Sequence, residues 1–300
     1  MATNFRKGCA GTSNRREFLK RMTLAGASLT LSAPGFAKPR PRMQLGLVTY
    51  QWGRNWDLPT LLANCEKAKI YGVELRTEHK HGVEPTLSAQ QRMEVKKRFA
   101  DSAVKLIGYG SNDEYHSTDP SEVRKNIEHT KALLQLMVDV GGSGVKVKPN
   151  GFPKGVPHEK TIEQIGKSLR ITGEFAKDLG QLIRLEVHGA GTQELPNIKA
   201  IMDVADHPNV KVCWNSNDED LIGQGLEYNF NLVKDRLGDT THVRELNVGS
   251  YPYQDLMGLL VKANYRGWVL LECRTEPADL VAAMAEQREL FEQMLNKAKA

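Results

Sequence analysis

Residues 182–188 read Leu-Ile-Arg-Leu-Glu-Val-His, a run in which apolar residues alternate with ionisable ones. Alternation with a period of two is typical of a β-strand whose two faces meet different surroundings. An amphipathic stretch, Glu159–Leu179, comes before this run, and Gly180 separates the two as a helix stop signal. A second amphipathic stretch, Leu195–Ala205, comes after it. The sequence therefore predicts one strand between two helices.

The same order of short apolar runs and longer helical patterns continues along the chain from residue 43. Eight runs have the length and composition of strands, and they are Gln44–Trp52, Gly72–Arg76, Val104–Gly110, Gly144–Pro149, Leu182–His188, Val210–Trp214, His242–Val248 and Trp268–Cys273. Other helical patterns between them include Leu58–Ile70, Ser88–Asp101, Ser121–Val140 and a closing Asp279–Ala298. Only Asn217–Leu237, which is rich in polar and glycine residues, predicts an ordered loop as readily as a helix. This order predicts an α/β fold, a single (β/α)8 TIM barrel.

The alternative fold is a doubly wound open sheet. Its dinucleotide-binding form carries a GxGxxG turn after the first strand, and no such turn follows Gln44–Trp52. The 300 residues are 40% hydrophobic and 26% charged, a composition typical of a globular protein rather than a disordered or coiled-coil one. No linker rich in Pro, Gly or Ser divides the chain after residue 43. A single barrel domain is therefore predicted over residues 38–300.

Residues 14–20, Asn-Arg-Arg-Glu-Phe-Leu-Lys, resemble the twin-arginine export signal. The apolar stretch Met22–Phe36 and the small residue Ala37 follow, as in a cleavable leader. This stretch is shorter than the roughly 20 residues that a membrane span needs. Residues 1–37 are therefore expected to be a signal peptide, and the mature chain to be periplasmic or otherwise exported, with no stable membrane span. The alternative is a basic amphipathic helix that stays on the protein.

The positive charge of the chain is concentrated in this leader. The whole sequence has a formal net charge of +5, and residues 1–37 hold six basic residues and one acidic residue. The remainder carries 35 basic and 35 acidic residues. Because no basic surface remains to neutralise a phosphate backbone, nucleic acid is excluded as an expected partner. The mature cysteines, Cys65, Cys213 and Cys273, are an odd set that does not fit a disulfide framework.

Alternation places ionisable side chains of five predicted strands inside the barrel. The inward-facing residues are expected to be Glu74 and Arg76, Lys146 and Lys148, Arg184, Glu186 and His188, His242 and Arg244, and Glu272 and Arg274. Burying so many charges is unfavourable unless they pair, bind a metal or meet a charged ligand. The alternative is a purely structural network of ion pairs. Six cations face three carboxylates, which favours an anionic ligand or an oxyanion formed during a reaction.

Four segments of the later strands resemble the metal-site motifs of the xylose isomerase-like TIM barrel superfamily. They are Leu185-Glu186-Val187-His188, Cys213-Trp214-Asn215-Ser216-Asn217, His242-Val243-Arg244-Glu245 and Leu270-Leu271-Glu272. The superfamily includes sugar and sugar-phosphate isomerases, ketose epimerases, inosose dehydratases and the endonuclease IV group. The resemblance covers essentially the whole mature chain, because the motifs follow one another in the family's order. Dimers and tetramers are common in this family, so a homo-oligomer is among the expectations.

The resemblance implies a divalent ion, manganese, magnesium or cobalt. Its implied ligands are Glu186, Asn215, His242 and Glu272. Asn215 stands where the family has an aspartate, and Asp218 where it has a histidine. An amide oxygen coordinates a hard cation without adding charge, so weaker metal binding is expected. The alternative is a metal-free site in which a cation such as Arg244, Lys146 or Lys148 replaces the ion.

The resemblance also implies a sugar isomerase or epimerase that moves a proton next to a carbonyl through an enediolate, and the leader adds the expectation that this enzyme is exported. Glu186 and Glu272 are the implied acid and base. The other candidates, expected to bind a small carbohydrate or sugar acid, are Glu74, Arg76, Lys146, Lys148, His188, Arg244 and Arg274.

Two other functions remain open. A keto-sugar dehydratase or lyase would use the same apparatus if a hydroxyl left once the carbanion formed. A non-catalytic carbohydrate-binding barrel would account for the missing aspartate. A metal-dependent nuclease does not fit the charge of the mature chain.

Overall fold

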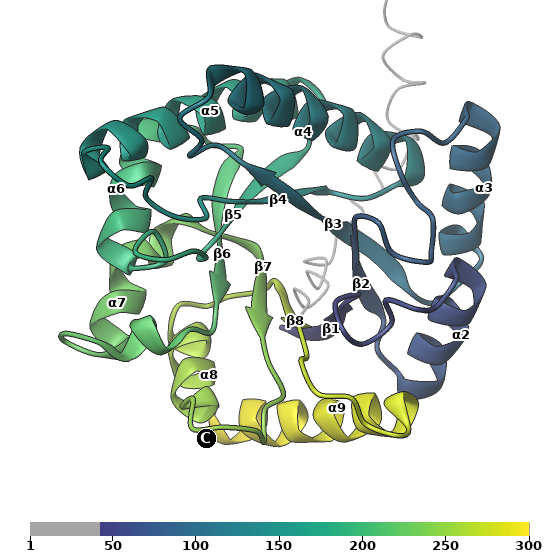
Figure 1. Cartoon of the computed structure of the whole chain (residues 1–300). Coiled ribbons are helices and arrows are strands. Elements are labelled where there is room, and N and C mark those ends of the chain that lie inside the picture. Colours follow the sequence, from purple (N-terminus) through teal and green to yellow (C-terminus); the bar gives the residue numbers. More distant parts are fainter. Residues whose placement is uncertain (1–42, 300) are drawn as a thin grey trace, which may run out of the picture. The chain divides into compact units, whose positions relative to one another are not determined.

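Each of the eight apolar runs contributes a parallel strand in the computed structural model, which describes residues 43–299. The strands are β1 (Gln44–Val48), β2 (Gly72–Arg76), β3 (Lys105–Glu114), β4 (Gly144–Lys148), β5 (Leu182–Glu186), β6 (Val210–Asn215), β7 (Leu237–Val243) and β8 (Trp268–Leu271). They follow one another round a closed barrel in which β8 pairs with β1 (Figure 1). The predicted single (β/α)8 barrel is confirmed. The predicted twin-arginine leader, residues 1–37, lies outside the described residues.

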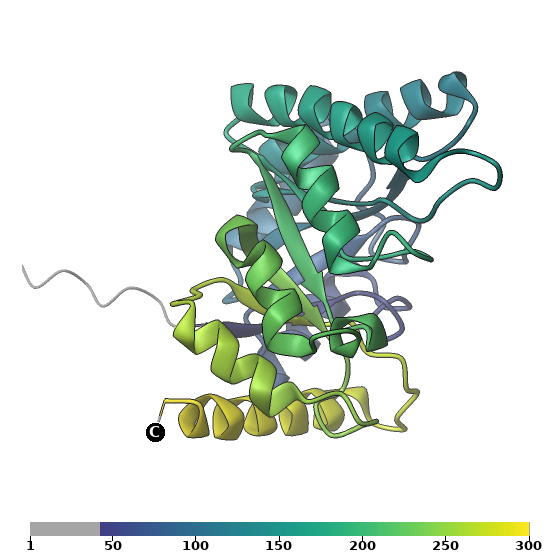
Figure 2. The ribbon, with the colours of Figure 1, turned by 90° about the vertical axis from the view of Figure 1, so that its left-hand side faces the viewer.

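The helices surround the strands (Figure 1). They are α2 (Leu58–Ala68), α3 (Ala89–Ala100), α4 (Pro120–Val140), α5 (His158–Asp178), α6 (Leu195–Ala205), α7 (Leu226–Val233), α8 (Tyr253–Lys262) and α9 (Leu280–Lys297). Figure 2 shows the barrel from the side, with α5 and α9 on opposite flanks. Within residues 43–299 no helix is both long enough and apolar enough to cross a membrane.

Local signals in the sequence explain where the helices begin and end. Before α3, the Ser88 hydroxyl accepts a hydrogen bond from the Gln91 backbone N–H, and the Gln91 side chain accepts one from the Ser88 N–H. This reciprocal cap satisfies N–H groups that the first helical turn leaves unpaired. After α4, Gly141 takes a left-handed conformation with φ of 91°, which stops the helix without a side-chain clash.

The seventh strand differs most from the prediction. It was expected over His242–Val248, but β7 runs from Leu237 to Val243. Its first five residues read Leu-Gly-Asp-Thr-Thr, which has no apolar alternation, although Thr240 and Thr241 are fully buried. The preceding Asn217–Leu237 segment holds two short 3-10 turns, Asp218–Leu221 and Lys234–Arg236, on either side of the eight-residue α7.

Arg184 explains why polar residues belong in β7. Its guanidinium donates to both carboxylate oxygens of Asp239, at 2.8 and 2.9 Å, and to the Ser143 hydroxyl at 2.8 Å. A Cβ on Gly108 would lie 2.2 Å from this guanidinium, so the glycine makes room for it. Arg184 precedes Glu186 by two residues, or roughly 7 Å along an extended strand. It therefore fills the interior below the strand ends, and its charge is already neutralised.

Candidate functional site

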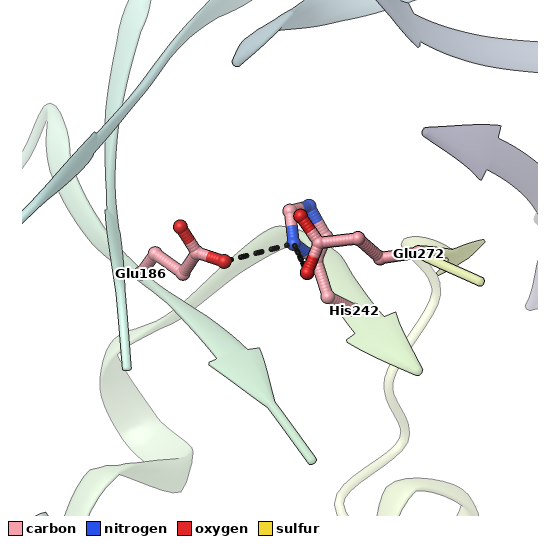
Figure 3. A group of neighbouring side chains, drawn as sticks. All are labelled: Glu186, His242 and Glu272. Atoms are coloured by element: carbon pink, nitrogen blue, oxygen red, sulfur yellow. Dashed lines mark ion pairs between the residues drawn. The ribbon is translucent and has the colours of Figure 1, made fainter. Parts of the chain in front are cut away.

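The carboxyl-terminal ends of four neighbouring strands bring the predicted metal ligands together. Glu186 and Asn215 end β5 and β6, His242 is the penultimate residue of β7, and Glu272 directly follows β8. Donor atoms of Glu186, His242 and Glu272 all lie within 4.8 Å of one another. Figure 3 shows the two carboxylates reaching the imidazole from separate strands. In this fold, that end of the barrel is where active sites are built.

His242 lies at the centre of three carboxylates. Its Nδ1 is 3.4 Å from Glu186 Oε1 and 3.8 Å from Glu272 Oε2, and its Nε2 is 3.3 Å from Glu74 Oε1. The ring and Glu74 are fully buried, yet both ring nitrogens and both Glu74 oxygens lack a hydrogen-bond partner among the described residues. Buried polar atoms without a hydrogen-bond partner are rare, and a bound ion or water molecule can satisfy them.

The charge around the imidazole favours a cation at this place. Burial opposes protonation of His242, but the adjacent Cys213 thiol and the carboxylates of Glu74 and Glu186 outweigh it and hold the imidazole pKa well above its usual value. Glu74 has no exposed surface, and the group that it reaches is the His242 ring. Its position is therefore that of a carboxylate that orients the histidine.

Glu186 is held in its ionised form by a buried ion pair. The Lys146 ammonium lies 2.5 Å from Glu186 Oε2, and neither side chain is more than 1% exposed. Burial raises the pKa of this carboxyl, but the charges of Lys146 and His242 more than reverse that effect and hold it well below its usual value. Asn215 Nδ2 donates to the other oxygen, Oε1, at 3.2 Å. Each oxygen of Glu186 thus has a different neighbour.

These donors fit a divalent metal ion. Two carboxylates, an imidazole and an amide are ligands that manganese, magnesium, cobalt or zinc accept. An imidazole binds a metal only in its neutral form, so a bound ion would displace the proton from His242. Lys146 occupies only one oxygen of Glu186, so Oε1 remains on the side of His242 and Asn215. Turning the Asn215 amide about its last torsion would present its oxygen where the nitrogen now lies. The set carries less negative charge than one with aspartate at 215.

Several predicted substrate-binding residues lie beside this group. Arg76 Nη1 is 3.4 Å from Glu272 Oε1, and its Nη2 donates to Asn112 Oδ1 at 3.1 Å. Lys148 Nζ donates to the same Asn112 oxygen at 3.4 Å, and burial together with Lys146 holds the pKa of Lys148 below its usual value. His188 is partly exposed, and its buried Nδ1 has no hydrogen-bond partner among the described residues. Arg76, Lys148 and His188 therefore keep polar groups near the carboxylates.

The two arginines after the last strands are placed differently from the prediction. Alternation predicted inward positions for Arg244 and Arg274, but β7 ends at Val243 and β8 at Leu271. The Arg274 side chain is exposed, so its predicted inward position is wrong; only its backbone N–H is held, donating to Glu245 at 2.9 Å. Arg244 is partly buried. Beyond the end of a strand, side-chain direction no longer follows a period of two.

A buried acid in the loop after β6 was missed by the sequence reasoning. Asp220 is fully buried, and its Oδ2 accepts hydrogen bonds from the Tyr251 hydroxyl at 2.7 Å and the Asn217 N–H at 3.0 Å. Burial raises the pKa of Asp220 to about 7. Its neighbour Asp218, by contrast, is exposed. Nothing in a polar loop sequence distinguishes the covered acid from the exposed one.

The buried Asp220 should make stability depend on pH. Its pKa is about 7 when folded, against an ordinary 3.8, so the unfolded chain loses this proton first as pH rises. The free energy of unfolding should fall, relative to that of Asp220→Asn, by about 3 kcal/mol between about pH 4.5 and 7.5. Urea unfolding at both pH values measures the difference. The matched Asp218→Asn variant should keep the wild-type pH dependence. If the free energy of unfolding of Asp220→Asn changes with pH in parallel with that of the wild-type protein, Asp220 does not have the raised pKa.

Comparisons with known proteins agree with this fold. A family model described as a xylose isomerase-like TIM barrel matches residues 62–294. L-ribulose 3-epimerase superposes with a TM-score of 0.74 at 15% identity over 86% of this chain and 96% of that one. The apo form of the 3-keto-D-glucoside 4-epimerase YcjR from E. coli superposes with a TM-score of 0.71 at 15% identity, over 84% of this chain and 100% of that one. The IOLI protein with a bound zinc atom superposes with a TM-score of 0.72 at 15% identity, over 85% of this chain and 99% of that one. A comparison of the sequence with curated proteins found no match.

Proposed function

Because the chain belongs to the xylose isomerase-like TIM barrel family, we propose that it is a sugar isomerase or epimerase. It would move a proton at the carbon next to a carbonyl, through an enediolate. The observation that carries this proposal is the pair of buried glutamates, Glu186 and Glu272, that reach the His242 ring from β5 and from the end of β8 (Figure 3). The named epimerases among its structural neighbours support the same reaction class.

The reaction needs a base, an acid and stabilisation of the enediolate oxygen. Glu186 is placed to be the base, because it is buried at the end of β5 and ionised beside Lys146, and only the ionised carboxylate can accept a proton. Glu272 comes from another strand and is suited to return the proton, with Arg76 holding one of its oxygens. In an epimerisation the two carboxyl groups act on opposite faces of the reacting carbon. Lys148 and His188 are proposed to bind the hydroxyl groups of the sugar.

A divalent ion, manganese, magnesium or cobalt, is part of this proposal. Glu186, Asn215, His242 and Glu272 would hold it, and a bound ion supplies a Lewis acid for the carbonyl oxygen. The zinc bound by the structurally similar IOLI protein supports the proposal that this fold holds a metal here too. Glu74 would keep the His242 ring in place, since its carboxylate lies 3.3 Å from Nε2.

Deuterium exchange tests the proposed reaction without knowledge of the natural substrate. The purified protein is incubated in D2O with free ketohexoses and with 3-keto-glucose, and the sugars are followed by NMR. Deuterium at the carbon next to the carbonyl, together with a new isomer, supports the proposal. Exchange with loss of a hydroxyl group would identify a lyase. Binding without exchange, with manganese present, would identify a non-catalytic barrel and overturn the proposal.

Metal binding should respond to the residue at position 215. Manganese is expected to raise the melting temperature of the wild-type protein, and excess chelator to reverse the rise. Asn215→Asp adds a charged ligand and should bind manganese about tenfold more tightly or better. Calorimetric titration with Mn²⁺ measures both affinities. The control Asn264→Asp adds the same charge at an exposed turn, and equal affinities in all three proteins would remove position 215 from the metal site.

We also propose that the protein is exported by the twin-arginine route and that the mature chain begins near residue 38. Residues 14–20 and the balanced charge of the remaining chain support this proposal. Cell fractionation of the full-length protein should find it outside the cytoplasm. The double variant Arg15→Lys, Arg16→Lys should stay inside, and identical localisation of both would contradict the proposed route.

A further inference from the structure

A cavity opens among the loops that follow β3 and β4. Its volume is about 540 Å³, within the range of ligand pockets. The residues that line it include Glu114, His116, Glu122, Asn126, Asn150 and Phe152. They come from the end of β3, the start of α4 and the loop after β4. The cavity therefore belongs to the catalytic end of the barrel, although none of the predicted site residues lines it.

The wall of this cavity is built by close backbone contact. Gly189 has φ of 96°, and a Cβ there would lie 2.4 Å from the Asn150 backbone, so the loops after β4 and β5 touch directly. A Cβ on Gly191 would lie 3.0 Å from the Phe152 ring. The Phe152 ring also stacks on His158, with centroids 3.8 Å apart and planes 11° apart. Phe152 is thereby held at the cavity before any ligand arrives.

The lining has the chemistry of a site for a neutral, hydroxyl-rich ring. Glu114 accepts from Asn150 Nδ2 at 2.6 Å, and His116 Nδ1 lies 3.4 Å from the second Glu114 oxygen. That histidine nitrogen is buried and makes no hydrogen bond among the described residues. The lining residues include two glutamates and neither lysine nor arginine. Such a wall repels phosphates and carboxylates but hydrogen-bonds hydroxyl groups beside an aromatic face.

A continuous series of polar contacts joins this cavity to the proposed catalytic residues. Glu114 Oε1 lies 3.9 Å from Lys148 Nζ, and Lys148 donates to Asn112 at 3.4 Å. Asn112 also accepts from Arg76 at 3.1 Å, and Arg76 pairs with Glu272 at 3.4 Å. A ligand bound between Lys148 and Glu272 would thus have this cavity beside it.

We propose that the cavity between the loops after β3 and β4 binds a second, neutral sugar ring. The substrate would then be a glycoside or oligosaccharide, with its keto ring at Glu186 and Glu272 and the attached ring against Phe152. The assignment of the keto ring rests on the proposed function, whereas binding of the second ring is a separate property of this cavity.

Calorimetry with unreactive sugars tests the cavity directly. The probes are glucose and a panel of neutral disaccharides, including cellobiose, maltose and lactose. The wild-type protein should bind at least one disaccharide about fivefold more tightly than glucose, and Phe152→Ala and His116→Ala should each lose that preference. The control Tyr71→Ala removes an exposed aromatic ring just before β2, at the amino-terminal end of the barrel, and should keep it. Equal affinities for glucose and every disaccharide, or a preference that survives in both cavity variants, would overturn the proposal.

Failure of this inference can be told apart from failure of the proposed function. Glu186→Gln should lose deuterium exchange on a free keto-sugar while it keeps the disaccharide preference. If the wild-type protein never exchanges deuterium, but Phe152→Ala loses the preference for a disaccharide, the cavity proposal stands and the isomerase proposal is refuted. If the wild-type protein exchanges deuterium but shows no preference for disaccharides, the isomerase proposal stands and the cavity proposal is refuted.

Discussion

Glu186→Gln should lower the rate of deuterium exchange on a keto-sugar by about 10²–10⁴-fold, the usual contribution of a positioned acid–base group. The amide keeps the size of the side chain and an oxygen for the metal, but it cannot accept the substrate proton. Glu186 is 1% exposed and bonded to both Lys146 and Asn215, so the variant tests the proton acceptor with little change in shape. The measurement is the exchange rate by NMR with saturating manganese, which separates proton transfer from weaker metal binding.

The control for this experiment is Glu159→Gln, which makes the same change at an exposed position in the first turn of α5. It should exchange at the wild-type rate. If the exchange rate of Glu186→Gln lies within about threefold of the wild-type rate, the loss is far smaller than expected and Glu186 is not the proton acceptor. Glu186→Gln leaves the buried Lys146 without its counter-charge and should melt earlier. The exchange rate is therefore measured well below the melting temperature of each variant, so that unfolding does not contribute to the loss.

Lys146→Met should destabilise the chelator-treated protein by about 3–5 kcal/mol, because it leaves a buried carboxylate without its counter-charge. Lys146 is fully buried, and its ammonium lies 2.5 Å from Glu186 Oε2. Methionine preserves most of the volume, so the change is mainly electrostatic. Urea unfolding at pH 7 measures the loss, and the chelator prevents a metal ion from taking over the missing positive charge.

Two comparisons identify the cause of that loss. Adding Glu186→Gln to Lys146→Met should restore much of the stability, since the double variant buries no unpaired charge. Lys97→Met removes an exposed lysine that pairs with Asp101 on the surface and should cost less than about 1 kcal/mol. If the two lysine variants are equally stable, the buried pair does not contribute as proposed.

The barrel follows from local periodicity, because a period of two sends alternate side chains inward and parallel strands place their carboxyl ends at one edge. A residue at the end of one strand must therefore lie near those at the ends of its neighbours. The meeting of Glu186, His242 and Glu272 was predicted by the resemblance to the family's metal-site motifs, since periodicity alone placed His242 at the start of its strand. The donor atoms of these three residues, within 4.8 Å of one another, bear this out.

The tertiary structure alone decided which charges are neutralised by the protein itself. Periodicity gives a direction but neither depth in the barrel nor a partner, so the Arg184 pair with Asp239, 55 residues away, was invisible in the sequence. The same holds for Lys146, which looked free to meet a ligand but pairs with Glu186. Arg274 is exposed because its strand ends three residues earlier. Partners and strand ends depend on contacts between distant segments, and only the folded chain brings those segments together.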